Sequence, residues 1–265
     1  MDLTVHLNDP NITQLGLTTE REFCKAMAVA TLEEGGILAV TIGLKEPILN
    51  LVIDTQVEEK DIQQRIIQAA EFFKQHQVSW IWLVGPLSNP PTLARHLERY
   101  GLKLLEQTPA MYYDLLWPLP VSDEQVEENI NIREAGPEDQ LLEWIEPVRE
   151  GFPGSNETEG FRALSARLPH GPDTPFRHYM LRHRGQVVGS ITLYLGTDAV
   201  MILNLATKNA FRRHGFGGAL TRHVMRVAKR LGYKHSFLNT STKGYNLYRK
   251  LGFQVYCVNK IYGTK

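Results

Sequence analysis

The chain has 265 residues, which suits one large domain or two ordinary ones, and its apolar content of 43% is enough for a hydrophobic core. Its 29 Lys and Arg residues balance 29 Asp and Glu residues, and this net charge of zero argues neither for a nucleic-acid partner nor for a membrane surface. No apolar run approaches the ~20 residues that a membrane span needs, and the first ten residues lack the basic and apolar regions of a signal peptide. Cys24 and Cys257 fit no metal or redox spacing. We therefore expect a cytoplasmic protein without a metal.

The first 118 residues predict an ordered series of elements: a helix, two strands, a long amphipathic helix, a strand, a short helix and a final strand. Thr19, with Glu22 three residues later, is typical of a capping box, so the first helix is expected to begin there and to end before the Gly35-Gly36 pair. The other elements are expected over residues 37–43, 48–54, 58–77, 79–84, 90–100 and 103–116.

Residues 119–129 contain proline and a run of acidic residues, which is typical of a linker. A second series of elements follows over residues 130–265. A strand, two helices and a hairpin are expected over residues 130–133, 138–150, 158–168, 176–183 and 186–195.

The charges are divided unevenly along the chain. No Asp or Glu follows Asp198, whereas 13 of the Lys and Arg residues do, so the last 67 residues carry +13 and the first 198 carry −13. Such a basic segment suits a ligand that brings several phosphate groups. The basic residues are scattered along elements rather than clustered with aromatic residues, so a nucleic-acid partner is not expected.

The central motif lies within this basic segment. An apolar strand over residues 200–206 leads into Arg212-Arg213-His214-Gly215-Phe216-Gly217-Gly218, and a helix follows directly. Glycines between a strand and a helix let backbone N–H groups converge on an anion, and the helix N-terminus adds partial positive charge. A Walker loop is excluded because no Lys-Ser/Thr follows, and a dinucleotide fold is excluded because no acid follows.

The pattern Arg212-x-x-Gly215-x-Gly217 resembles the acyl-CoA loop of the GNAT N-acetyltransferase superfamily. Further on, Tyr248-x-x-x-Gly252-Phe253 resembles the second signature of that superfamily, in the expected order and at the expected distance. The resemblance implies an α+β fold with two GNAT-like domains, each a mixed, mostly antiparallel sheet flanked by helices.

The first series of elements has the same order as the second, but it lacks the residues of the two GNAT signatures. Leu97-Glu98-Arg99-Tyr100-Gly101-Leu102 aligns with the segment that ends in Gly252-Phe253, but leucine stands in place of Tyr248. The stretch 55–59, where a phosphate loop would lie, has no glycine or arginine and contains two acids that would repel a pyrophosphate. We interpret residues 1–118 as a degenerate domain that binds no CoA, and residues 130–265 as the acetyl-CoA-binding domain.

The resemblance implies acyl transfer from acetyl-CoA, as cosubstrate, to a primary amine of a small molecule or a peptide. Tyr248 would be the acid that protonates the departing thiolate, with Tyr245 in reserve. Ser241 departs from the family pattern, which has asparagine at that position. Cosubstrate contacts are expected from Asn204, Leu205, Ala206, Arg212, Arg213, His214, Gly215, Phe216, Gly217, Gly218, Ser241 and Asn246.

The general base and the acceptor site stay open at this point. Asn204 stands on the central strand where an acid would be expected, which leaves Glu157, Glu159, a histidine such as His178 or His214, or a water chain as alternatives. The family resemblance also makes Phe152, Ser155, Asn156, Glu157 and Glu159 candidates for substrate contact. The alternative function is a non-catalytic acyl-CoA sensor or interaction module, and either a monomer or a homodimer fits the sequence.

Overall fold

The computed structural model describes residues 4–121, 130–136, 138–151 and 158–264, without the side chains of 138–140 and 158–162. These residues form two compact units, which are described separately. The first comprises the chain up to residue 110 together with segments 240–242 and 255–264, and the second comprises the remaining described residues. No helix in the described ranges is long and apolar enough to cross a membrane.

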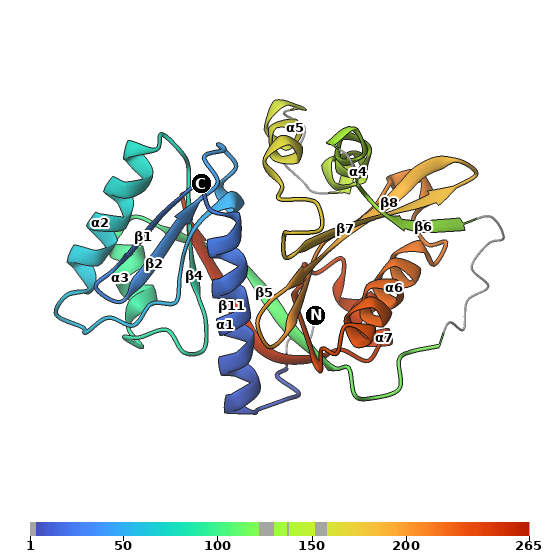
Figure 1. Ribbon diagram of the computed structural model, residues 1–265. Helices are drawn as coiled ribbons and strands as arrows, with labels where there is room; N and C mark the ends of the chain where they lie inside the picture. The colour runs from blue at the N-terminus through green and yellow to red at the C-terminus, as the bar shows by residue number, and fades with distance from the viewer. Residues whose placement is uncertain (1–3, 122–129, 137, 152–157, 265) are drawn as a thin grey trace. The chain divides into compact units, whose positions relative to one another are not determined.

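The first unit is a sheet between two helical layers (Figure 1). Strands β1 to β3 pair antiparallel, β3 pairs parallel with β4, and β4 pairs antiparallel with β11. Its elements are α1 (Pro10–Met27), β1 (Ala30–Glu34), β2 (Ile37–Thr41), η1 (Pro47–Leu49), β3 (Asn50–Ile53), α2 (Ile62–Gln75), β4 (Ile81–Val84), α3 (Leu93–Tyr100), most of β5 (Lys103–Asp114) and β11 (Gln254–Gly263).

Strand β2 shows why this sheet is covered on both faces. All five of its residues are buried, and successive side chains point to opposite faces of a strand. Ile37 and Ala39 pack with the core under α2 and α3, whereas Leu38 and Val40 pack with the core under α1. A continuous apolar strand is therefore expected to be covered on both sides, and Figure 1 shows the helices in these places.

The first helix begins earlier than predicted. Asp9 caps it by accepting hydrogen bonds from the backbone N–H groups of Asn11 and Ile12, and Pro10 occupies the first turn. Thr19 lies inside the helix, where its hydroxyl donates to the Leu15 carbonyl at 2.8 Å. The prediction was wrong because a threonine hydroxyl can bond within a helix as well as cap one. The helix also ends at Met27, and the missed strand β1 follows it.

The second unit repeats the arrangement. Strands β6 to β9 pair antiparallel in chain order, and β9 pairs parallel with β10, so the predicted mixed, mostly antiparallel sheet flanked by helices is confirmed. Its elements are the end of β5, β6 (Ile130–Glu134), α4 (Glu138–Gly151), α5 (Thr158–Arg167), β7 (Phe176–His183), β8 (Gln186–Leu195), β9 (Val200–Thr207), η2 (Asn209–Phe211), α6 (Phe216–Arg230), β10 (His235–Asn239) and α7 (Tyr245–Lys250).

Helices α4 and α6 cover opposite faces of this second sheet. Consecutive residues of β7 show this, because the ring of His178 meets Trp144 of α4, whereas the ring of Tyr179 meets His223 of α6. Figure 1 likewise places α4 and α5 on one side of β7 and β8, and α6 and α7 on the other.

The compact units differ from the expected domain boundaries at three places, one of which is segment 240–242, expected in the second domain but found in the first unit. The sequence analysis assigned residues 103–116 to the first domain and 255–265 to the second, whereas β5 passes into the second unit after Ala110 and residues 255–264 belong to the first. The pairing of β11 with β4 explains this, since it places Ile261 and Tyr262 in the two cores of the first unit.

Candidate functional site

The parallel strands β9 and β10 of the second unit pair only at their beginnings. The register joins Val200 to Ser236 and Met201 to Phe237, and in the described part of the chain it goes no further. Beyond these pairs, the edge of β9 that faced β10 is available to another partner. An extended molecule with amide groups could pair with that edge as an added strand would.

A β-bulge lies on β9 at the same place. On β8 one residue, Ile191, separates Ser190 from Thr192, but their partners on β9 are Ala206 and Leu203, which two residues separate. Asn204, the first of these two, has a left-handed φ of +53°. A bulge bends a strand and redirects its side chains and N–H groups, and bulges are common beside active sites. Residues 204–206 thus form an irregular edge.

The predicted phosphate loop connects β9 to α6. Arg212, Arg213 and His214 are exposed, while Gly215 is the N-cap of α6 with a φ of +76° that favours glycine. Phe216 is buried, with its ring 5.8 Å from that of His214 and 5.3 Å from that of His183. Its side chain is therefore committed to packing, and the loop can offer an anion the N–H groups of the first helical turn.

Two glycines in this first turn make room for neighbouring side chains. A Cβ on Gly217 would lie 3.3 Å from Leu247 Cδ2 and 3.8 Å from Leu205 Cδ2, and a Cβ on Gly218 would lie 3.2 Å from Arg222 Nη1. Sequence reasoning missed Arg222, which is buried one turn further along α6. Its spacing of four residues from Gly218 is a signal that could have found it, since side chains on a helix point back toward its N-terminus.

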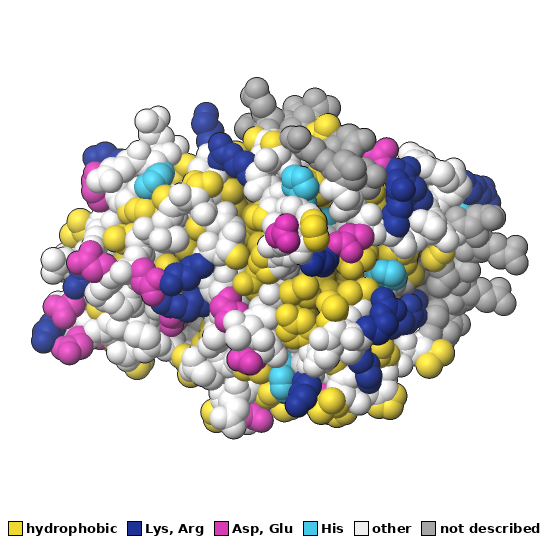
Figure 2. Space-filling view, viewed as in Figure 1, with side chains coloured by type: hydrophobic (Ala, Val, Ile, Leu, Met, Phe, Trp, Pro, Cys, Tyr) yellow, Lys and Arg dark blue, Asp and Glu magenta, His cyan; other side chains and the backbone are white. Residues whose placement is uncertain are grey.

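The electrostatic setting of the loop is basic, with one exception. Figure 2 shows Lys and Arg side chains gathered over α6 with few acidic side chains beside them. The exception is Glu150, near the end of α4, whose Oε1 accepts a hydrogen bond from the backbone N–H of Asn209 at 2.5 Å. A Cβ on the next residue, Gly151, would lie 3.1 Å from Ala206 Cβ. Helix α4 therefore braces both the end of β9 and the start of the loop, a contact that the sequence analysis did not predict.

Helix α7 carries the two candidate tyrosines. The side chain of Tyr248 is buried, with its ring 5.7 Å from Phe253, and burial raises its pKa well above the ordinary value of a phenol. Tyr245 is also buried, and the Arg249 guanidinium lies 5.9 Å from the centre of its ring. Tyr248 therefore keeps its proton at all physiological pH values, which suits a hydrogen-bond donor.

His178 does not have the surroundings of a general base. It is buried rather than exposed, its Nδ1 lies 2.9 Å from the Thr192 hydroxyl, and its Nε2 lies 3.0 Å from the Pro169 carbonyl oxygen. Since a carbonyl oxygen can only accept, Nε2 donates and Nδ1 accepts from Thr192. Burial lowers the pKa of His178 to about 4. Both ring nitrogens are thus engaged, Nδ1 across the β7–β8 hairpin and Nε2 with the segment before β7, which argues against His178 as the general base.

Two further predicted cosubstrate contacts have exposed side chains. Asn246 is exposed in the first turn of α7, and Ser241 is exposed in segment 240–242, which belongs to the first unit. The acceptor candidates Phe152, Ser155, Asn156 and Glu157 lie outside the described residues, as does the side chain of Glu159.

The corresponding place in the first unit is closed by backbone pairing. Strands β3 and β4 are also parallel and pair only at Leu51–Ile81 and Val52–Trp82, but the chain then pairs again. The Asn89 N–H donates to the Thr55 carbonyl at 2.8 Å, and the Val57 N–H donates to the Asn89 carbonyl at 3.1 Å.

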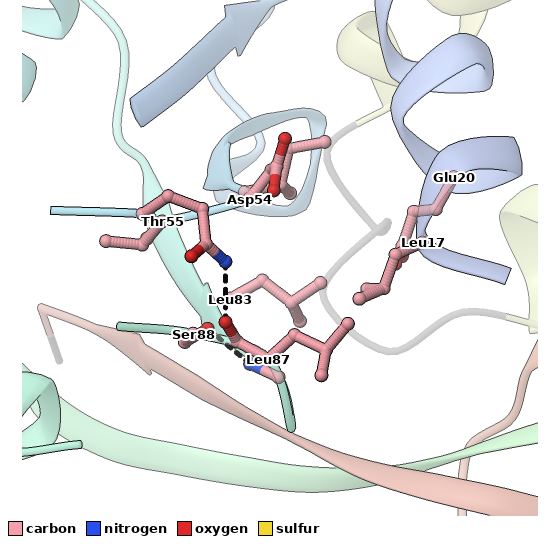
Figure 3. Close-up of a pocket in the computed structure, with 10 residues that line it drawn as sticks. Leu17, Glu20, Asp54, Thr55, Leu83, Leu87 and Ser88 are labelled. Atoms are coloured by element: carbon pink, nitrogen blue, oxygen red, sulfur yellow. Dashed lines mark hydrogen bonds between the residues drawn. The ribbon is translucent and has the colours of Figure 1, made fainter. Parts of the chain in front are cut away.

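A cavity of only about 20 Å³ is left there, between α1 and the ends of β3 and β4 (Figure 3). Leu17, Leu83 and Leu87 point into this space, and the Gln56 side chain donates across it to the Leu87 carbonyl at 2.6 Å. Such a volume holds about one water molecule. The strand edge that stays unpaired in the second unit is therefore occupied in the first unit by hydrogen bonds with Asn89.

No group of three or more His, Cys, Asp or Glu side chains that could hold a metal occurs among the described residues. Both cysteines are buried and free.

Comparisons with known proteins agree with this geometry. Residues 174–255 match the family model described as an acetyltransferase (GNAT) domain. The fold is similar to that of a GCN5-related N-acetyltransferase from Kribbella flavida, with 13% identity, a TM-score of 0.75, and coverage of 94% of this chain and 95% of the other. No curated protein sequence matches this chain significantly.

Two further structures extend the likeness. A GCN5-related N-acetyltransferase from Sphaerobacter thermophilus is 18% identical with a TM-score of 0.63, over 86% of this chain and 76% of the other. A tandem GNAT protein from the clavulanic acid biosynthesis pathway is 14% identical with a TM-score of 0.59, over 96% and 95%. The motifs and the open strand edge thus lie in or beside the segment 174–255 that matches the acetyltransferase (GNAT) domain, and the fold is that of the GNAT proteins compared.

Proposed function

We propose that the second unit is an acetyl-CoA-dependent N-acetyltransferase that acts on a primary amine of a small molecule or a peptide. The observation that carries the proposal is the β9 edge beyond Met201, which is unpaired with β10 and leads through a basic loop to the glycine-rich start of α6. Coenzyme A has a matching order of groups, since its amide-containing arm can pair with a strand edge and its pyrophosphate suits a helix N-terminus.

In the reaction, the amine nitrogen bonds to the thioester carbonyl carbon and the carbon–sulfur bond breaks. The products are an amide and the thiol, and an acceptor that begins as an ammonium ion releases one further proton to solvent. A backbone N–H at the bulge of β9 would stabilise the negative charge on the carbonyl oxygen. Because burial raises the pKa of Tyr248, its hydroxyl would stabilise the departing sulfur by donating a hydrogen bond rather than by losing its proton.

We further propose that the first unit is a degenerate GNAT-like domain that binds no CoA. The pairing of Asn89 with Thr55 and Val57 supports this, because it occupies the strand edge that a ligand would need. Asp54 also lies beside the small cavity, and its carboxylate forms an ion pair with Arg21 of α1. A tandem arrangement with one silent domain predicts one acetyl-CoA for each chain.

Calorimetric titration with acetyl-CoA tests both statements. We expect one site per chain in the wild type and no detectable binding to Gly217→Glu. Gly217→Gln is the matched control, since it has the same bulk without the charge that would repel a pyrophosphate, and we expect it to bind at least about tenfold more tightly than the glutamate variant. Two sites per chain would contradict the silent first unit, and equal binding by the wild type and Gly217→Glu would contradict the proposed loop.

A turnover assay distinguishes an acetyltransferase from the alternative, a non-catalytic acyl-CoA sensor. Release of the CoA thiol is measured with acetyl-CoA and a panel of primary amines and of peptides that have a free N-terminal amine. An acetyltransferase releases thiol in proportion to the amide formed, whereas a sensor binds acetyl-CoA and releases none with any amine. Absence of binding in the titration would contradict both functions.

A further inference from the structure

A groove in the second unit lies away from the proposed phosphate loop. It has a volume of about 430 Å³ and lies between strands β6 and β7 and the C-terminal half of α6. The α6 residues that line the groove run from His223 to Arg230, five to twelve residues beyond Gly218, which corresponds to about 8 to 18 Å along the helix axis. A ligand in the groove and one at the loop would therefore occupy separate sites.

The groove brings together guanidinium groups from three elements. Arg133 comes from β6, Arg177 from β7 and Arg230 from α6. Arg133 and Arg230 are exposed and form no ion pair with any described Asp or Glu. The Arg177 guanidinium is already engaged, because its Nη1 donates to the Thr174 carbonyl at 2.7 Å and its Nε lies 3.4 Å from Glu134 Oε1. Arg133 and Arg230 are left to bind a carboxylate or phosphate, which planar guanidinium groups do through paired hydrogen bonds.

Glu134 is the one acid among the described residues that line the groove, and it is already engaged. Glu134 Oε1 lies 3.4 Å from Arg177 Nε, and Glu134 Oε2 accepts a hydrogen bond from the Tyr179 hydroxyl at 3.4 Å. With three arginines and one glutamate, the lining keeps a formal charge of +2 when His223 is neutral. This net positive charge favours binding of an anion.

The rest of the lining is apolar or aromatic. Ile132 and Val227 are half-buried, and the rings of Tyr179 and His223 meet edge to face at 5.0 Å. Leu231, at the end of α6, is 56% exposed. Burial, and then the charges of Arg226 and Arg230, lower the pKa of His223, so its imidazole is neutral and can donate or accept a hydrogen bond.

The geometry points to a binding site for a small organic anion, with an apolar body against Ile132, Tyr179 and Val227 and a carboxylate or phosphate group between Arg133 and Arg230. The volume is that of a small-molecule site, and a few placed polar groups on an apolar floor are the composition of such sites. This site does not depend on acetyl-CoA binding at the loop.

Calorimetric titration of the full chain with phenyl phosphate and with benzoate tests the site. The experiment uses Gly217→Glu as the background, so that a phosphate cannot bind at the loop, and repeats it in the wild type. We expect binding of at least one of the two anions in both backgrounds, accompanied by shifts of the His223 ring resonances in NMR spectra. The anion that binds more tightly shows whether the site prefers a phosphate or a carboxylate group. Benzyl alcohol, which lacks the charge, and inorganic phosphate, which lacks the body, should bind at least about tenfold more weakly.

A pair of matched variants tests whether the anion binds in the groove. Arg230→Gln should weaken binding about tenfold or more, because it removes one charge-assisted contact. Arg184→Gln removes the same charge from the exposed β7–β8 turn and should change affinity by less than about twofold. Both positions are exposed, so thermal unfolding should be unchanged. The proposal is overturned if neither organic anion binds, if inorganic phosphate binds equally well, or if the two variants weaken binding alike.

Discussion

The buried His178 predicts a defined loss of stability in mild acid. Its two ring nitrogens are engaged by Thr192 and the Pro169 carbonyl, and its pKa is lowered from 6.5 to about 4, first by burial and further by the charges of His170 and Arg177. Between these two pH values the unfolded chain binds a proton at this site and the folded chain does not. The contribution of neutral His178 to the free energy of unfolding is therefore fully present above about pH 7, and it is lost progressively as the pH falls from 6.5 toward 4.

The magnitude follows from the two pKa values. The interval between 6.5 and about 4 corresponds to about 3 kcal/mol in total, at about 1.4 kcal/mol for each pH unit. At pH 5 the folded imidazole is still mostly neutral, and the linkage relation gives a loss of about 2 kcal/mol relative to pH 7.

Urea unfolding at pH 7 and at pH 5, for the wild type and for His178→Gln, checks this value. Glutamine can donate to the Pro169 carbonyl and accept from Thr192 without titrating, so the difference between the two proteins isolates the histidine. We expect the wild type to lose about 2 kcal/mol more than the variant on acidification. Equal losses in both proteins would refute the inference that His178 is held neutral.

Three further predictions concern turnover, a turn and the last strand. Tyr248→Phe should lower kcat about tenfold or more with little change in KM, since its hydroxyl would act on the departing sulfur; an unchanged kcat would remove it from the reaction. Gly36→Ala should destabilise the first unit by more than Gly101→Ala in thermal unfolding, because its Cβ would lie 2.0 Å from the Gln56 carbonyl oxygen, whereas Gly101 has open space and shares only the positive φ. Deletion of residues 255–265 should unfold the first unit, seen as loss of hydrogen-exchange protection in β2 to β4, because β11 pairs with β4 and completes its cores; retained protection would contradict that role.

Local patterns in the sequence determined much of the second unit. The hairpin over β7 and β8, the strand β9 and the glycine-rich start of α6 were predicted within a residue or two. Such elements follow from the period of apolar residues and from glycine at a left-handed position, both of which depend on near neighbours. The resemblance to GNAT proteins also rested on short motifs, and the family model and the fold bear it out.

Contacts between distant residues decided the rest. The sequence predicted that residues 55–59 would not bind a phosphate, but only the fold shows that Asn89 pairs with the strand edge beside them. His178 was an alternative for the general base in the sequence, but in the fold its ring packs against Trp144 and bonds Thr192. The bulge at Asn204 likewise depends on the register of β9 with β8. The arginines of the groove are 97 residues apart at the extremes, from Arg133 to Arg230. The sequence by itself therefore determined where a phosphate loop could form, and tertiary structure decided which strand edge stays open and which titratable groups are buried, because burial and pairing are properties of residues that meet only when the chain has folded.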